Sequence, residues 1–226
     1  MTSVLAIETS TSACSVALLV GESVISRYSE EPRSHTKLVM SMVDQVLARA
    51  SIKAIDLDGL AVTLGPGSFT GLRIGFATIQ GLAFGLDLPV VAVSSLQVMA
   101  QTAARKQGLE VGAIIMPILD ARMGEFNCGC YRLESNGQFS VLMSDQLLAA
   151  ELVLALIEKY QPNAVVGEGG QLEVTGLIDL YPDAVDLVSI AAPKFAQGMA
   201  QSIDSIELIY LRGTDAWQKR KPIRAV

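Results

Sequence analysis

A glycine-rich turn that runs into an apolar helix constrains this chain more than any other part of its sequence. The turn begins at Gly65-Pro66-Gly67, and the predicted helix starts at an N-cap, Thr70, and continues to Leu86. On a helical projection two opposite faces are apolar: Leu72, Phe76, Ile79 and Ala83 on one, and Gly71, Ile74, Thr78, Gly81 and Gly85 on the other. A helix that is apolar on nearly every side has to be covered from more than one direction. We expect the chain's own sheet to cover one face and another protein to cover the other.

The composition is that of a folded protein with one large domain or two small ones. The chain has 226 residues, of which 50% are hydrophobic and 18% are charged, and this balance excludes a disordered chain. Its net charge of -6 should repel a phosphate backbone. Four basic residues cluster near the C-terminus: Lys219, Arg220, Lys221 and Arg224. We interpret them as a solvated tail in preference to a nucleic-acid contact.

Neither a targeting segment nor a membrane span is expected. The first residues carry no basic region, and the longest apolar stretches are interrupted by Arg73, Asp87 or Asp120. The three cysteines, Cys14, Cys128 and Cys130, lack the Cys-x-x-Cys spacing and are interpreted as reduced core residues, with a metal site at the last two as the alternative. We therefore expect a cytoplasmic protein that does not associate with membranes.

Residues 1–108 are predicted to form one α/β lobe. Its elements, in order, are a strand at 4–7, a hairpin of strands at 14–20 and 23–28, a helix from a Ser34 cap to 50, a strand at 59–64, the helix after the glycine turn, a strand at 89–93 and a helix at 95–107. Gly108 closes this lobe.

Residues 109–226 are predicted to begin with the same order and to end in the basic tail. The expected elements are a strand at 111–119, a hairpin at 126–132 and 138–142, a helix from 144 or 145 to 160, a strand at 164–166, a loop at 167–170 and a helix after Pro193. Strand, hairpin, helix, strand and helix thus occur twice. The repeat predicts two related lobes with mixed sheets flanked by helices.

The glycine turn has two interpretations. Backbone N–H groups at a helix start can bind an anion, but no Gly-Lys-Ser/Thr follows Gly67 or Gly71, and the spacing of Gly65, Gly67 and Gly71 is not that of a dinucleotide-binding loop. We favour a packing role for these glycines.

Catalytic and metal-binding groups are sparse. His35 is the only histidine, and at a helix start it favours an interface or capping role over that of a base. One histidine and two cysteines on one strand are a poor zinc or iron ligand set. Glu8 and Asp120 end predicted strands, where they would orient a metal-bound nucleotide or act as ordinary turn and cap residues.

Five motifs resemble one protein family. In chain order they are Ile7-Glu8-Thr9-Ser10-Thr11, Ser34-His35-Thr36, the glycine motif at 65–75, Asp120-Ala121-Arg122-Met123-Gly124-Glu125 and Tyr210-Leu211-Arg212. Together they resemble the TsaB (YeaZ) family of bacterial tRNA threonylcarbamoyladenosine biosynthesis proteins. The resemblance implies a duplicated actin-like ATPase (ASKHA) fold. It also implies a role in placing threonylcarbamoyl on N6 of the adenosine beside the anticodon in ANN-decoding tRNAs, with transfer performed by a homologous partner, TsaD, and an ATPase, TsaE, in the same assembly.

The resemblance further implies a noncatalytic subunit. Ser95 and Met99 stand where the catalytic relative carries its metal-binding histidine pair, and Glu8-Thr9-Ser10 replaces the Asp-x-Gly of actin-like ATPases. We therefore expect no cofactor in this chain, with ATP or ADP and metal at the partner subunits. A vestigial nucleotide cleft would lie at Glu8, Asp120 and Gly169.

The expected partner surface lies on the helices that begin at Ser34 and Thr70. Its residues are His35, Val39, Met42, Val46, Leu72, Arg73, Phe76 and Ile79. This patch would serve TsaD or a homodimer, and tRNA would be reached only through the complex. Alternatives are that both helices are buried within the chain, that the chain is an actin-like kinase or ATPase using Glu8 and Asp120, and that it is a peptidase, for which no credible triad is present.

Overall fold

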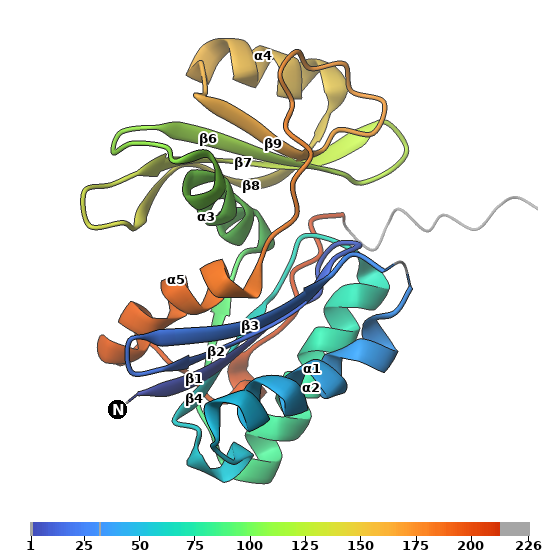
Figure 1. The fold of residues 1–226 in the computed structure, drawn as a ribbon. Helices are drawn as coiled ribbons and strands as arrows, with labels where there is room; N and C mark the ends of the chain where they lie inside the picture. Colours follow the sequence, from blue (N-terminus) through green and yellow to red (C-terminus); the bar gives the residue numbers. More distant parts are fainter. Residues whose placement is uncertain (1, 32, 213–226) are drawn as a thin grey trace, which may run out of the picture.

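A computed structural model describes residues 2–31 and 33–212 and arranges them in two lobes, each built on a mixed sheet (Figure 1). The first sheet contains β1 (Ser3–Glu8), β2 (Cys14–Val20), β3 (Ser23–Ser29), β4 (Gly59–Thr63) and β5 (Val90–Val93), in the order β3-β2-β1-β4-β5. The second contains β6 (Ile114–Asp120), β7 (Glu125–Leu133), β8 (Phe139–Ala149) and β9 (Ala164–Glu168), in the order β8-β7-β6-β9. Hairpins give the antiparallel pairs, and helical crossovers make β1, β4 and β5 parallel to one another and β6 parallel to β9.

The helices lie in layers above and below these sheets (Figure 1). They are α1 (His35–Ala50), α2 (Phe69–Leu86), α3 (Ser95–Gln107), α4 (Ala150–Tyr160) and α5 (Ala184–Ala196), with short 3-10 turns at Ala54–Asp56 and Ile203–Ser205. Helices α1 and α2 cover the outer face of the first sheet, and α4 covers the outer face of the second. Helices α3 and α5 pack together between the two sheets. The predicted two-lobe α/β fold with mixed sheets is confirmed.

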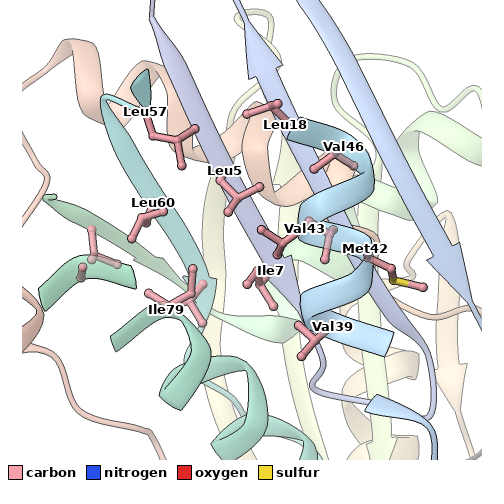
Figure 2. Close-up of a cluster of buried hydrophobic side chains, with 14 of the residues drawn as sticks. Leu5, Ile7, Leu18, Val39, Met42, Val43, Val46, Leu57, Leu60 and Ile79 are labelled. Carbon is pink, nitrogen blue, oxygen red and sulfur yellow. The ribbon is translucent and has the colours of Figure 1, made fainter. Parts of the chain in front are cut away.

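Side-chain alternation along β1 explains why the first sheet has helices on both faces. Leu5 and Ile7 point into the cluster with α1 and α2, whereas Val4 and Ala6 point to α5. Figure 2 shows the first of these clusters, in which Val39, Met42, Val43 and Val46 of α1 are directed at the strands that carry Leu5, Ile7 and Leu18. The apolar stripe of α1 is therefore used to build the core of its own lobe.

The packing does not follow the expected division at residue 108. Helix α3 precedes that point, yet it packs through Leu96 and Met99 into the core of the second sheet. Helix α5 follows it, yet it packs through Leu187 and Val188 on the first sheet. Each lobe is thus completed by a helix from the other half of the sequence.

Several element boundaries differ from the predicted ones. Ser68, not Thr70, is the N-cap of α2, because the Ser68 hydroxyl accepts a hydrogen bond from the Gly71 amide. Ser34 occupies the N-cap of α1, but its hydroxyl donates to the Glu31 carbonyl instead of capping a helix amide.

The second half contains the larger differences. Residues 144–149 extend β8 and do not begin α4, because β7 is long enough to pair with this segment. Glu125 of β7 pairs with Ala149, and Cys128 pairs with Gln146. The helix expected after Pro193 is α5, which begins at its Asp183 cap and contains Pro193 in its last turn. The strand expected from Val111 begins at Ile114. The basic tail at 219–224 lies outside the described residues.

No helix within residues 2–31 and 33–212 is long and apolar enough to cross a membrane.

Candidate partner groove and interlobe cleft

The glycines of the motif allow the start of α2 to pack directly on the loop after β1. A Cβ on Gly67 would come within 2.2 Å of the Ser10 carbonyl oxygen, and one on Gly75 within 2.3 Å of the Thr9 hydroxyl. The Ser68 amide donates to the Ser10 carbonyl at 2.6 Å, so this amide is not available to an anion. The packing interpretation of the glycine motif is confirmed.

Glu8 lies beneath this loop and not in an open cleft. Its side chain is buried, and its carboxylate accepts hydrogen bonds from the Ser10 amide at 2.5 Å and the Ser10 hydroxyl at 3.2 Å. Burial raises the pKa of Glu8 from 4.5 to about 7, and the Ser10 hydrogen bonds oppose that rise. The expectation that Glu8 faces a nucleotide cleft is wrong, because the carboxylate supports the loop from inside.

His35 fixes the other end of the same loop. Its Nε2 lies 3.1 Å from the carbonyl oxygens of both Thr11 and Ala13. Since carbonyl oxygens only accept, Nε2 must carry the proton and donate to both. His35 is buried within the chain, so it orders the loop and is not exposed to a partner.

A cleft of about 1090 Å³ lies between the lobes. The start of α2, the loop after β1, the β6–β7 turn and the segment after the second 3-10 turn surround it; among the lining residues are Thr11, Ser68, Arg73, Asp120, Arg122, Glu168, Tyr210 and Arg212. Of the three residues expected in a vestigial nucleotide cleft, only Asp120 lines this space. Its carboxylate pairs with the Arg122 guanidinium at 3.3 Å.

Gly169 lies away from the cleft. A Cβ at this position would meet the Leu177 side chain at 2.4 Å, so Gly169 serves the packing of the loop after β9. Its expected place in a nucleotide cleft is wrong, because the loop turns toward Leu177 and leaves Glu168 at the cleft wall.

The positions compared with a histidine pair point into a core. Ser95 and Met99 are both fully buried, and the Met99 side chain lies in the cluster between α3 and the second sheet. The Met99 sulfur also lies close to Gly167, where a Cβ would meet it at 2.9 Å. Met99 therefore faces apolar side chains, and neither position lines the interlobe cleft.

The cysteines are core residues, as predicted. Cys14, Cys128 and Cys130 are free and buried, and burial raises the pKa of the Cys14 and Cys130 thiols to about 11. Among the described residues, no three side chains of histidine, cysteine, aspartate or glutamate come together as a metal site.

A separate groove of about 550 Å³ runs between α1 and α2 on the outside of the first lobe. It is lined by Thr36, Val39, Met40, Phe69, Thr70, Arg73, Ile74, Ala77 and Thr78. Met40 is 46% exposed and Phe69 is 56% exposed, so two large apolar side chains of the groove are open to solvent. The Arg73 guanidinium lies 3.5 Å from the centre of the Phe69 ring.

This geometry corrects the expected partner surface. His35, Met42, Val46, Leu72 and Ile79 are buried inside the chain, because the apolar stripe of each helix faces the sheet. Phe76 is half-buried against the same core, and Val39 reaches only the floor of the groove. Arg73 alone of the eight residues is exposed.

The exposed residues that sequence reasoning missed are Met40, Phe69 and Tyr210. Met40 and Phe69 lie outside the apolar stripes. The sequence signal for an exposed contact surface was therefore a large apolar residue at a helix position that faces solvent. The ring centres of Phe69 and Tyr210 are 5.6 Å apart, although 140 positions separate them in sequence. Phe69, Thr70 and Arg73 line both the groove and the cleft, so the two hollows are adjacent.

Comparisons with known proteins identify the family. A family model described as TsaD, tRNA N6-adenosine threonylcarbamoyltransferase, matches residues 24–169. The tRNA threonylcarbamoyladenosine biosynthesis protein TsaB of Escherichia coli (strain K12) is 37% identical over 227 aligned residues, which cover 96% of this chain and 97% of that protein. The chain belongs to the TsaB family.

Two further relatives agree with this TsaB assignment. TsaB of Haemophilus influenzae is 34% identical, over 95% of each protein. A crystal structure from Pseudomonas aeruginosa, described as a protein with similarity to peptidase YEAZ, is 36% identical with a TM-score of 0.84, and the match covers 94% of this TsaB-family chain and all of that one. The actin-like, duplicated fold implied by the five motifs is thus shown for this chain.

Proposed function

We propose that this TsaB-family chain is a noncatalytic subunit that supports threonylcarbamoylation of N6 of the adenosine beside the tRNA anticodon by binding TsaD. The role in threonylcarbamoyladenosine biosynthesis follows from membership of the family. The noncatalytic part is supported by the burial of Ser95 and Met99 in a core and of Glu8 beneath a loop. TsaD and TsaE would supply the chemistry, with nucleotide and metal held by those subunits and tRNA reached only through the assembly.

The observation that carries the proposal is the exposed groove between α1 and α2. Met40 and Phe69 leave apolar surface open to solvent, and Arg73 adds a positive charge beside them. Exposed apolar surface of this kind is characteristic of protein contacts. A partner with two similar helices would pack its own apolar side chains into the groove. TsaD meets this requirement because the family model for TsaD matches the part of this chain that contains both helices.

A single charge tests the contact. Met40→Glu places a carboxylate in the groove and should weaken binding to TsaD at least about tenfold, because the charge would have to be desolvated against the apolar side chains of a partner. Met40 is exposed, so Met40→Glu should stay folded. Val39 forms the buried floor of the groove, so Val39→Glu should prevent folding. Binding is measured by calorimetry, and the complex by size-exclusion chromatography.

The matched control is Leu152→Glu on α4. Leu152 is 56% exposed and lies on the outer helix of the second lobe, away from the groove. The control should bind TsaD as the parent chain does. Equal affinity of a folded Met40→Glu variant would show that the groove is not the contact. Loss of self-association with intact TsaD binding would assign the groove to a homodimer.

The noncatalytic role has its own test. The pure chain should neither transfer threonylcarbamoyl nor hydrolyse ATP, whereas its addition to TsaD and TsaE should increase modification of tRNA. Turnover of ATP by the chain alone would instead support the actin-like ATPase alternative.

A further inference from the structure

The segment Ile209–Arg212, here called the strap, connects the two lobes across the mouth of the interlobe cleft. At its start the Ile209 amide donates to the Leu64 carbonyl at 2.9 Å, just after β4 in the first lobe. In its middle Tyr210 lies against Phe69. At its end Arg212 reaches the β6–β7 turn, Asp120–Glu125, in the second lobe.

The β6–β7 turn has a backbone conformation that its side chains disfavour. Arg122 has φ of 68° and Met123 has φ of 60°, followed by Gly124 at 77°. Two consecutive residues with a Cβ in the left-handed region are uncommon, and they persist only where neighbouring groups hold them. Met123 is 83% exposed, so burial of its side chain does not hold the turn.

Arg212 supplies the groups that hold it. Its Nη2 donates to the carbonyl oxygens of Ala121 and Arg122, each at 3.1 Å, and lies 2.6 Å from a Glu125 carboxylate oxygen. Its Nη1 contacts the Met123 sulfur at 2.9 Å. One planar guanidinium therefore contacts four residues of the turn, an arrangement that a lysine ammonium cannot reproduce.

The turn lines the cleft that lies next to the groove between α1 and α2. Asp120, Ala121 and Arg122 line the cleft on the side of the second lobe, and Phe69 and Arg73 line both hollows on the side of the first. A protein bound between α1 and α2 would thus lie beside the interlobe cleft. Arg212 contacts the β6–β7 turn, which forms the opposite wall of that cleft.

We propose that Arg212 is a positioning residue, which fixes the left-handed β6–β7 turn and thereby the wall of the cleft that faces a partner in the α1/α2 groove. The first part concerns the chain alone, and the second rests on the proposed function. Arg212 acts through the turn, so its loss should leave the groove and its affinity for TsaD intact while lowering the support that the chain gives to tRNA modification.

The test uses Arg212→Ala, Arg212→Lys and the control Arg132→Ala in the full chain. Arg132 is exposed and lies at the opposite end of β7 from the turn, so its removal changes the net charge equally. Amide exchange is followed by NMR at Ala121 and Glu125, whose N–H groups are hydrogen-bonded within the turn. Arg212→Ala should speed exchange there about tenfold, Arg212→Lys less, and Arg132→Ala not at all.

The same variants are then added to TsaD and TsaE with tRNA. Arg212→Ala should bind TsaD within about twofold of the parent chain, yet give a lower rate of modification, with partial recovery in Arg212→Lys. Unchanged exchange in Arg212→Ala overturns the proposal, as does faster exchange with an unchanged rate. If the parent chain itself fails to stimulate the reaction, the proposed function fails, and the exchange experiment still decides whether Arg212 positions the turn.

Discussion

Gly71 lies so close to Thr9 that a Cβ on Gly71 would come within 2.1 Å of the Thr9 carbonyl oxygen. The Thr9 hydroxyl also donates to the Gly71 carbonyl at 2.8 Å. The first turn of α2 is therefore packed on backbone and not on flexible side chains, so a methyl group cannot be accommodated by a change of rotamer. The loop after β1 and the start of α2 behave as one unit.

Gly71→Ala should accordingly destabilise the chain by about 1–3 kcal/mol, because overpacking against the backbone outweighs the gain in helix propensity. Gly81→Ala, on the same helix with nothing within 4 Å of its Cβ position, is the matched control and should stabilise by up to about 1 kcal/mol. Denaturant unfolding of both variants measures the difference. Stabilisation by both substitutions would contradict the packing role.

Glu8 should make the stability of the chain depend on pH. Its folded pKa of about 7 lies above the unfolded value of 4.5, so the folded state binds the proton more tightly. This contribution is fully present below pH 4.5 and is lost as the pH rises through about 7. Between about pH 5.5 and pH 8 the parent chain should lose about 2 kcal/mol relative to Glu8→Gln.

The comparison with Glu8→Gln cancels the pH dependence that the two chains have in common. Glutamine keeps an oxygen that can accept from the Ser10 amide and removes the charge. Unfolding curves at several pH values give the difference directly. A difference that does not change with pH would mean that Glu8 has the same pKa in both states.

The ion pair of Arg105 and Asp186 should contribute more to the free energy of unfolding than a surface ion pair does. Two parallel hydrogen bonds, of 2.8 and 2.7 Å, join the α3 guanidinium to a carboxylate of α5 that is 1% exposed. Arg105→Ala should cost about 2 kcal/mol, since it leaves Asp186 buried without its partner. Adding Asp186→Asn should recover part of that loss. Additive losses in this double-mutant cycle would show that the two residues are not coupled.

The isolated chain should bind tRNA weakly. Its net charge of -6 opposes the phosphate backbone, and we expect a dissociation constant above about 1 µM at physiological salt. Filter binding or fluorescence anisotropy with unmodified tRNA measures it. Tight binding that survives removal of residues 219–224 would refute the electrostatic argument.

Local sequence signals predicted the elements that end at a residue with a clear turn or capping preference, such as glycine. The strand Cys14–Val20 and the helix Ser95–Gln107 have the predicted bounds, because Gly21 turns the hairpin and Gly108 takes the left-handed conformation after the helix. Elements whose ends depend on a partner strand were mispredicted. Residues 144–149 contain two leucines and an alanine that suit a helix, yet pairing with β7 makes them strand.

The candidate site could be predicted only in part, for a related reason. The apolar stripe of α1 indicates that one face is buried, but not whether a sheet or another protein covers it. Val46 and Leu72 proved to be core residues, while the exposed apolar surface belongs to Met40 and Phe69. The contact of Tyr210 with Phe69 depends on the return of the chain after α5, which no local pattern encodes.

The exchange of α3 and α5 between the lobes makes the two halves of the chain complementary fragments. A chain cut after Gly108 would give one piece whose sheet lacks α5 and another whose sheet lacks α3. Each piece would expose an apolar sheet face to water, so neither should fold alone. Mixed together, the pieces should reconstitute the native molecule. Although the repeat in the sequence indicates two similar units, the exchanged helices should make the protein unfold as one cooperative body, so that neither unit is stable when it is separated from the other.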